Sequence, residues 1–414
     1  MSDLFGYLFV GGVAAAVTAI TTPLVGKFAR QFGWMATPDE RRSHPEPTPD
    51  VGGIAFFIAL VVAIAVAWQM DRFDPLFRNN SELIGVIVAG LIVFVLGFVD
   101  DIHEVSAPMK VTGVVVAAIA LVWFGVTMIY FRAPFVDVFV LSRDWIPLFT
   151  VLWLLGMTQA INLIDGLDGL AAGIVAIAAT AFFIYSRHLG MNGLLSEPNI
   201  GPLVAIITVG ICVGFLPYNF NPAKIFMGDS GALLLGLLFA VSTSVVGGRA
   251  SPDVKSDGGQ TYFFLAPLLI PILVLGVPII DVLFAIIRRT RSGVGFATAD
   301  TGHLHHRLIK LGHGPRRAVV ILWLWTALLS AFVLYPALSE RSASLWPFLF
   351  LVALLGWFTR FNERFWASGL FKSKTQQPQL DQPVQLAQAG QPDAEPAVVP
   401  EVQPEVQPEV QPDI

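Results

Sequence analysis

Charged side chains are scarce in this sequence. Asp, Glu, Lys and Arg make up 13% of the 414 residues and hydrophobic residues make up 55%, whereas a typical soluble domain is about one quarter charged. A soluble globular domain is therefore excluded. Alternating segments of roughly ten residues, typical of outer-membrane barrels, are also missing. The composition predicts an all-α fold, a polytopic integral membrane helical bundle.

Cysteine is almost absent as well. The single cysteine, Cys212, lies within an apolar run, which excludes an intramolecular disulfide bond. The first apolar run begins near residue 4, and no basic segment or clear cleavage site accompanies it. We therefore expect a retained first helix rather than a removed signal peptide.

Long apolar runs recur along the chain, and many are near the ~20 residues that a helix needs to cross a bilayer. The predicted membrane helices, about eleven in number, are 4–23, 51–70, 82–99, 111–131, 146–161, 168–187, 200–217, 231–248, 262–286, 317–336 and 345–360.

Every second loop between these segments is rich in Asp, His, Asn and Gly. These loops are 24–50, 100–110, 162–167, 218–230 and 287–316. A chain that crosses the membrane twice between two loops returns to the same side, so all five are expected on one face. That face and the C-terminal end hold 17 of the 25 Lys and Arg residues, and the positive-inside rule makes it cytoplasmic. The N-terminus is then expected outside and the C-terminus in the cytoplasm.

The end of the chain differs in composition from the rest. Residues 375–414 contain seven acidic residues and no Lys or Arg, and they include three tandem Glu-Val-Gln-Pro units. Such a segment cannot bury a packed core. We therefore expect a membrane-embedded domain, residues 1–370, followed by a disordered, acidic, Pro/Gln-rich cytoplasmic tail, residues 371–414.

The loop 100–110 begins with two adjacent carboxylates, Asp100 and Asp101, and ends with Lys110. Adjacent carboxylates are suitable ligands for Mg²⁺, a hard cation that prefers oxygen, and one of them could instead accept a proton. The alternative interpretation is a pair of solvated acids at the edge of the membrane.

The stretch QAINLIDGLDGLAAG, residues 159–173, places Asn162, Asp165 and Asp168 between two apolar segments. An ionised carboxylate in hydrocarbon is costly unless it is paired, solvated or bound to a metal. The glycine after each aspartate lets a phosphate or a sugar approach the backbone closely. The alternative is an Asx turn that ends one helix and caps the next.

The motif FMGDSG places Asp229 at the start of a predicted helix. A carboxylate there can hold a cation that in turn holds a phosphate. The alternative is that Asp229 or Ser230 is a simple N-cap. The first loop, around residues 37–53, is interpreted as a basic topogenic loop with a Pro-Gly entry into the next segment.

The loop 287–316 combines histidines with arginines, among them Arg289, His303, His305 and His306. Because no cysteine accompanies the histidines, a zinc site is less favoured than phosphate binding. The alternative is a basic loop that touches lipid headgroups.

On one face of a membrane, these motifs together predict a magnesium-dependent site for phosphorylated substrates, one of which is a lipid. The rival class is an ion-coupled transporter. A transporter requires charged groups near the bilayer midplane and internal repeats, whereas the acids here crowd one face and the loop motifs do not repeat.

Four motifs give the sequence a specific resemblance, namely DD at 100–101, NLIDGLDGLAAG at 162–173, FMGDSG at 226–231 and HLHH at 303–306. Over about residues 1–365 the chain resembles the polyprenyl-phosphate N-acetylhexosamine-1-phosphate transferases, and the interrupted HLHH is most similar to the UDP-GlcNAc branch. Two positions depart from the family pattern. Glu104 stands where the family has a third aspartate, and Thr301 follows Asp300 where a basic residue is common.

The resemblance implies transfer of GlcNAc-1-phosphate from UDP-GlcNAc to undecaprenyl phosphate, which gives undecaprenyl-diphosphate-GlcNAc and UMP. It implies Mg²⁺ as the cofactor, with Mn²⁺ as a substitute. The implied catalytic and metal-binding residues are Asp100, Asp101 and Asp229. The implied substrate-binding residues are Asn162, Asp165, Asp168, Lys110, Arg289, His303, His305 and His306.

The resemblance also implies a place in the cell. The enzyme would lie in the bacterial cytoplasmic (inner) membrane with its site facing the cytoplasm, and its product would prime a surface polysaccharide such as O-antigen. The same chemistry on UDP-MurNAc-pentapeptide or another UDP-N-acetylhexosamine stays open. The oligomeric state is also open, with a homodimer as one option, and no nucleic acid partner is expected.

Overall fold

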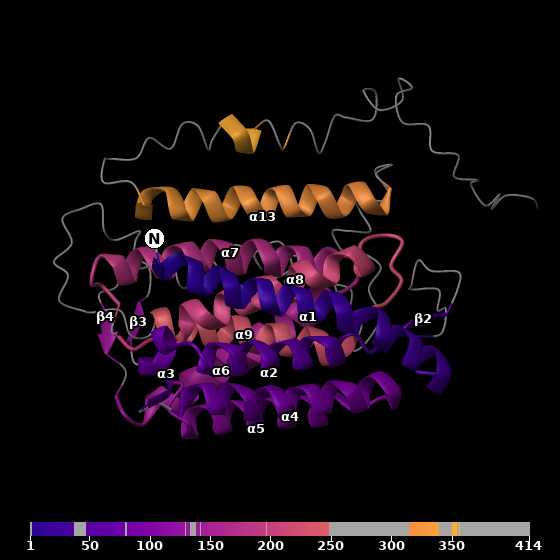
Figure 1. Ribbon diagram of the computed structural model, residues 1–414, viewed down its shortest axis with the longest axis horizontal. Coiled ribbons are helices and arrows are strands. Elements are labelled where there is room, and N and C mark those ends of the chain that lie inside the picture. Colours follow the sequence, from indigo (N-terminus) through magenta and orange to yellow (C-terminus); the bar gives the residue numbers. More distant parts are fainter. Residues whose placement is uncertain are drawn as a thin grey trace, which may run out of the picture. The chain divides into compact units, whose positions relative to one another are not determined.

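Helices dominate the part of the chain that the structure, a computed structural model, describes. The described residues are 2–36, 47–78, 81–128, 130–132, 138–140, 142–195, 197–247, 314–338, 350–353 and 356, and they all belong to one unit, Met1–Phe365. The helices are α1 (Ser2–Phe32), α2 (Gly53–Trp68), α3 (Asp74–Arg78), α4 (Glu82–Ile102), α5 (Ala107–Trp123), α6 (Trp145–Ile164), α7 (Leu170–Met191), α8 (Gly201–Asn219), α9 (Gly228–Gly247) and α13 (Pro315–Leu338). Figure 1 shows the helices from α1 to α9 lying side by side.

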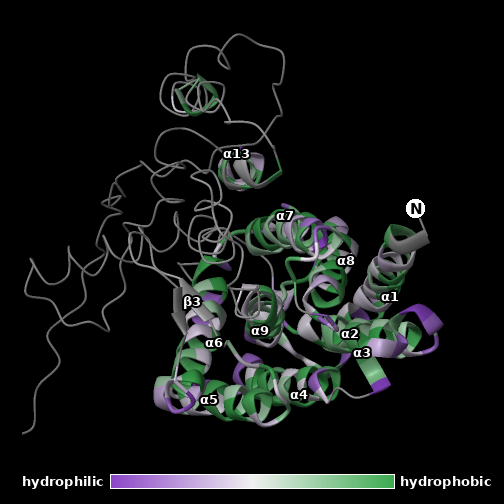
Figure 2. Ribbon diagram, turned by 90° about the vertical axis from the view of Figure 1, so that its left-hand side faces the viewer, coloured by the Kyte–Doolittle hydropathy of each residue, from purple (hydrophilic) through white to green (hydrophobic). Residues whose placement is uncertain are grey.

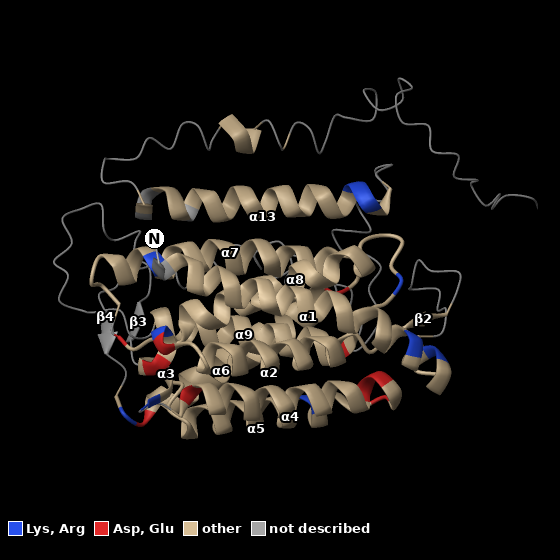
Figure 3. Ribbon diagram, viewed as in Figure 1, with Lys and Arg blue, Asp and Glu red and all other residues tan. Residues whose placement is uncertain are grey.

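Seven of the described helices are long and apolar enough to cross a membrane: α1, α4, α6, α7, α8, α9 and α13. The number rises to eight if α2 and the following helical residues, which bend by 91°, form one span. Most residues of these helices are hydrophobic (Figure 2), and charged residues gather toward the helix ends (Figure 3). The prediction of an integral membrane helical protein is confirmed.

The number of spans and their orientation stay predictions. The predicted helix 262–286 and most of 345–360 lie outside the described residues, as does the tail 371–414. The division into a domain 1–370 and a tail is untested for the same reason.

The predicted helix 111–131 is wrong in its last third. Helix α5 ends at Trp123, and Gly125 follows with a φ of +96°, a conformation that L side chains rarely adopt. Beyond it, strand β3 (Tyr130–Arg132) pairs antiparallel with β4 (Val138–Val140). Short runs rich in apolar and β-branched residues fit a strand as well as a helix, and here a glycine ends the helix.

Helix α1 continues beyond the predicted end at residue 23, although Pro23 lies inside it. A proline lacks the N–H that would bond to the carbonyl four residues earlier, which is that of Ala19. The hydroxyl of Tyr218, on α8, donates to the Ala19 carbonyl oxygen at 2.9 Å. A neighbouring helix therefore replaces the missing hydrogen bond, and α1 extends to Phe32.

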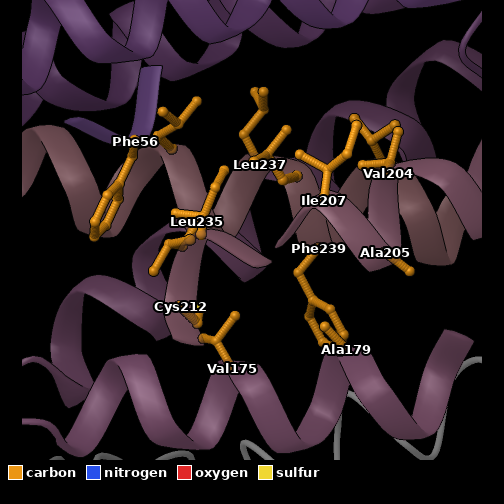
Figure 4. Packing of buried hydrophobic residues seen from close by; sticks show 14 of the residues in the cluster. Phe56, Val175, Ala179, Val204, Ala205, Ile207, Cys212, Leu235, Leu237 and Phe239 are labelled. Carbon is orange, nitrogen blue, oxygen red and sulfur yellow. The ribbon is translucent and has the colours of Figure 1, made fainter. Parts of the chain in front are cut away.

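Helix α9 lies at the centre of the core. It contacts α2, α4, α6, α7 and α8, and nearly all of its side chains are buried. Figure 4 shows Phe239 of α9 directed toward Ala179 of α7, and Cys212 of α8 between Leu235 of α9 and Val175 of α7. Because α9 is enclosed by its neighbours, the position of its first turn is determined by the helix ends and loops around it.

Candidate active site

The first and fourth polar loops meet beside the start of α9. A two-residue strand, β2 (Thr48–Pro49), pairs with β1 (Met35–Ala36) after α1. The amide of Phe226 donates to the Pro49 carbonyl at 2.8 Å, and the amide of Gly52 donates back to the Phe226 carbonyl at 3.0 Å. The predicted Pro-Gly entry into α2 therefore also supports the segment that leads to Asp229.

Lys110 joins two of the predicted carboxylates. Its Nζ lies 2.5 Å from Oδ2 of Asp100, in the last turn of α4, and 2.6 Å from Oδ2 of Asp229, in the first turn of α9. The side chains of Lys110, Asp100 and Asp229 are 24%, 11% and 26% exposed, so water reaches this cluster only in part. An ammonium group thus occupies the position between two carboxylates, where it balances their charges.

Asn162 brings a fourth helix to this cluster. It lies in the last turn of α6, and its Nδ2 is 3.5 Å from Oδ2 of Asp229, at the limit of a hydrogen bond. The ends of α4, α5, α6 and α9 therefore meet at Asp229, as the shared face of their loops predicts.

The two aspartates of the third loop lie in turns. Asp165 is the C-cap of α6. The carboxylate of Asp168 accepts hydrogen bonds from Nδ2 of Asn221 at 2.8 Å and from the amide of Ala223 at 3.0 Å. Asp168 therefore links the third loop to the fourth. The alternative of an Asx turn that caps α7 is wrong in its capping part, since the N-cap of α7 is Gly169 and no side chain caps it.

Asp101 points to a different partner from its neighbour Asp100. Its Oδ1 accepts the amide of Asp229 at 2.6 Å, and its Oδ2 accepts both the hydroxyl of Ser230 at 2.6 Å and the Ser230 amide at 3.2 Å. Asp100 instead accepts the amide of Val105 at 2.7 Å and contacts Lys110. Asp101 therefore bonds to the backbone of α9, whereas Asp100 contacts the ammonium group of Lys110.

Sequence reasoning missed Asn219, and it considered Ser230 only as an N-cap. Asn219 is buried at the end of α8, where its Oδ1 accepts the amide of Gly169 at 3.0 Å and its Nδ2 donates to the Ile225 carbonyl at 3.0 Å. The signal was present in the sequence, since a polar amide next to an apolar segment needs partners when it is buried.

The remaining predicted site residues cannot be placed. Arg289, His303, His305 and His306 lie outside the described residues. The last part of their loop is described, and there Nε of Arg316 donates to the carbonyl of Asn221 at 2.7 Å.

The oxygen atoms of the cluster decide which metal would fit. Within the described ranges, no group of three or more His, Cys, Asp or Glu side chains is arranged to hold a metal ion. The cluster around Asp229 offers the carboxylates of Asp100 and Asp229 and the side-chain amide of Asn162. Such a set does not suit zinc, but Mg²⁺ is commonly held by one or two carboxylates together with substrate phosphates.

The fold and the cluster define a helical membrane protein with a partly buried group of carboxylates, lysine and asparagine at the ends of its helices. Comparison with known proteins makes the class specific. Residues 83–247 match glycosyl transferase family 4, and this match includes all the described members of the cluster.

The relatives agree with this match over most of the chain. A decaprenyl-phosphate N-acetylglucosaminephosphotransferase of Mycobacterium tuberculosis is 37% identical over 327 residues, which cover 78% of this chain and 80% of the relative. A probable undecaprenyl-phosphate N-acetylglucosaminyl 1-phosphate transferase of Bacillus subtilis is 35% identical over 344 residues, 83% of this chain and 87% of the relative. A phospho-N-acetylmuramoyl-pentapeptide-transferase of Staphylococcus haemolyticus is 32% identical over 247 residues, 55% of this chain and 73% of the relative.

The chain therefore belongs to glycosyl transferase family 4 and is an enzyme of the transferase class. This assignment decides between the enzyme and the transporter in favour of the enzyme.

Proposed function

We propose that this enzyme transfers GlcNAc-1-phosphate from UDP-GlcNAc to undecaprenyl phosphate. An oxygen of the lipid phosphate attacks the phosphorus bonded to the sugar, the bond from that phosphorus to UMP breaks, and undecaprenyl-diphosphate-GlcNAc forms. The names of the Mycobacterium tuberculosis and Bacillus subtilis relatives support a polyprenyl phosphate acceptor and a GlcNAc-phosphate group.

The observation that supports the proposal most is the cation between two carboxylates, Lys110 between Asp100 and Asp229. Both substrates are anions, so the site must offset their repulsion before phosphorus and oxygen can approach. Lys110 can give up its contact with Asp100 and bind the lipid phosphate instead. Asp100, released from the lysine, is then placed to receive the acceptor and take its proton.

Asp229 is the residue that we propose as the principal metal ligand, and sharing the metal is the alternative role of Asp100. Mg²⁺, or Mn²⁺ in its place, would neutralise charge on the diphosphate and on the departing UMP. The few carboxylates of the cluster fit this role because substrate phosphates complete the coordination of Mg²⁺.

The remaining residues are proposed to bind the nucleotide sugar. Asn162 lies beside Asp229, and Asp165 and Asp168 lie in the loop that follows α6. We assign Arg289 and the three histidines, His303, His305 and His306, to the diphosphate or the sugar phosphate, because a guanidinium carries a positive charge and an imidazole N–H can donate to phosphate oxygens.

The place of the reaction follows from the lipid substrate and from the distribution of Lys and Arg. We propose that the enzyme lies in the bacterial inner membrane with its site facing the cytoplasm, where UDP-sugars are made. The product would prime a cell-surface polysaccharide, such as O-antigen.

The test is a transfer assay on the purified full-length protein. Undecaprenyl phosphate and radiolabelled UDP-GlcNAc are supplied with Mg²⁺ or with EDTA, and wild type is compared with Asp229→Asn. We expect metal-dependent label in the lipid and release of UMP, both lost in the variant. Absence of transfer from any UDP-sugar would overturn the proposal.

The nearest alternative is the same reaction on UDP-MurNAc-pentapeptide, which the Staphylococcus haemolyticus relative makes reasonable. The assay separates the two donors directly. Label from UDP-MurNAc-pentapeptide but not from UDP-GlcNAc would keep the mechanism and change the donor.

A further inference from the structure

The first amides of α9 donate their hydrogen bonds to a residue of another helix. The first amides of a helix have no acceptor within that helix. Here the amides of Asp229 and Ser230, and the Ser230 hydroxyl, all donate to the carboxylate of Asp101 on α4. Asp101 therefore caps α9 from outside, 128 residues earlier in the chain.

Glycines make this contact possible by letting the backbones approach. Gly228 has a φ of +68°, and a Cβ there would lie 2.5 Å from Oδ2 of Asp101 and 2.6 Å from the Asp50 carbonyl oxygen. On α4, a Cβ at Gly97 would overlap the backbone of Ser230. Helix α4 is thus in direct backbone contact with the start of α9, and no larger residue fits at either glycine.

The contacts of the two adjacent aspartates differ in kind. Asp100 meets the side chain of Lys110, which also contacts the side chain of Asp229. Asp101 meets the backbone that holds Asp229 and the hydroxyl of Ser230. Both oxygens of Asp101 are engaged, and their three hydrogen bonds take up most of the acceptor positions of this carboxylate.

We propose that Asp101 is a positioning residue, which holds the first turn of α9 so that the side chain of Asp229 stays beside Lys110 and Asp100. This assignment rests on the proposed function and replaces the catalytic and metal-binding roles that the sequence predicted for Asp101. Its partner in that task is Ser230.

The first experiment measures the cap without measuring activity. Hydrogen–deuterium exchange of the full-length protein follows the amides of residues 226–233 in wild type, Asp101→Ala and Asp100→Ala. The two variants remove neighbouring carboxylates from the same helix, so Asp100→Ala is the matched control. We expect faster exchange at the start of α9 in Asp101→Ala alone. Equal exchange in the two variants would overturn the proposal.

The second experiment measures transfer with Asp101→Asn, which keeps one oxygen to accept the Asp229 amide. Positioning predicts a kcat loss of about 10- to 100-fold for Asp101→Ala, the range typical of residues that orient a ligand. Asp101→Asn should recover most of this loss, and KM values should stay near wild type in both variants. A base or a metal ligand would lose as much in the asparagine variant as in the alanine variant, and that result would overturn the proposal.

Ser230→Ala provides a mild variant in case Asp101→Ala does not fold. It should lower kcat in the wild-type background and have little further effect in Asp101→Asn, since the two residues act together. Fully independent effects would count against the proposal. If wild type transfers no sugar phosphate at all, the proposed function has failed, and the exchange experiment alone still decides the role of Asp101.

Discussion

Lys110 offers the sharpest test of the charge balance in the cluster. We predict that Lys110→Met lowers transfer by at least about 100-fold, because removal of the ammonium leaves two carboxylates facing each other and weakens binding of the anionic substrates. Lys110→Arg keeps the charge with a different shape, and it should retain more activity than Lys110→Met.

The magnitude follows from the geometry. The oxygens of Asp100 and Asp229 cannot be farther apart than the two distances to Nζ added together, 2.5 Å and 2.6 Å. Two like unit charges at about 5.1 Å repel by about 3 kcal/mol at an effective dielectric constant of about 20. This corresponds to a factor of roughly 150 in a rate or an equilibrium.

Two measurements check the prediction. The transfer assay gives kcat and the KM for the lipid phosphate, which should rise in Lys110→Met. Titration with Mn²⁺, followed by electron paramagnetic resonance, should show tighter metal binding in Lys110→Met than in wild type, because the ammonium no longer competes for the carboxylates. Lys110→Met with wild-type turnover, or with unchanged Mn²⁺ affinity, would refute this account of the cluster.

Three further predictions concern other parts of the chain. Deletion of residues 375–414 should leave transfer intact, and a large loss of turnover at unchanged expression would contradict the expected disordered tail. Tyr218→Phe should destabilise the protein by about 1–3 kcal/mol, measured as a lowered midpoint of thermal unfolding, and the loss should be smaller in a Pro23→Ala background, where the helix supplies its own donor. Asp168→Ala should speed proteolysis of the loop at Asn221, because that loop loses its carboxylate partner, and equal cleavage rates in both proteins would count against the link.

Much of the candidate site could be predicted because topology restricts where polar loops can lie. Alternation of the loops predicted that Asp100, Lys110, Asn162 and Asp229 share one face, and the structure brings all four together. Their chemical roles stay predictions. The apolar runs were equally informative, since nine of the predicted helices overlap helices in the described residues.

The failures come from contacts that no local pattern records. Asp100 and Asp101 are adjacent, but successive residues of a helix point about 100° apart, so their partners depend on the rotation of α4. The continuation of α1 beyond Pro23 depends on Tyr218, which lies 199 residues beyond the accepting carbonyl in the chain. Residues 287–313 of the fifth loop lie outside the described residues, so the roles of its histidines stay predictions.

The bond from Tyr218 to Ala19 has a consequence for how the protein is made. Helix α1 is synthesised long before α8, so at first the carbonyl that Pro23 leaves without a donor has no partner from α8. An unpaired carbonyl in hydrocarbon costs several kcal/mol, which favours any arrangement in which α8 reaches α1. The hydrogen bonding of α1 is therefore complete only after α8 has been synthesised and has packed against it.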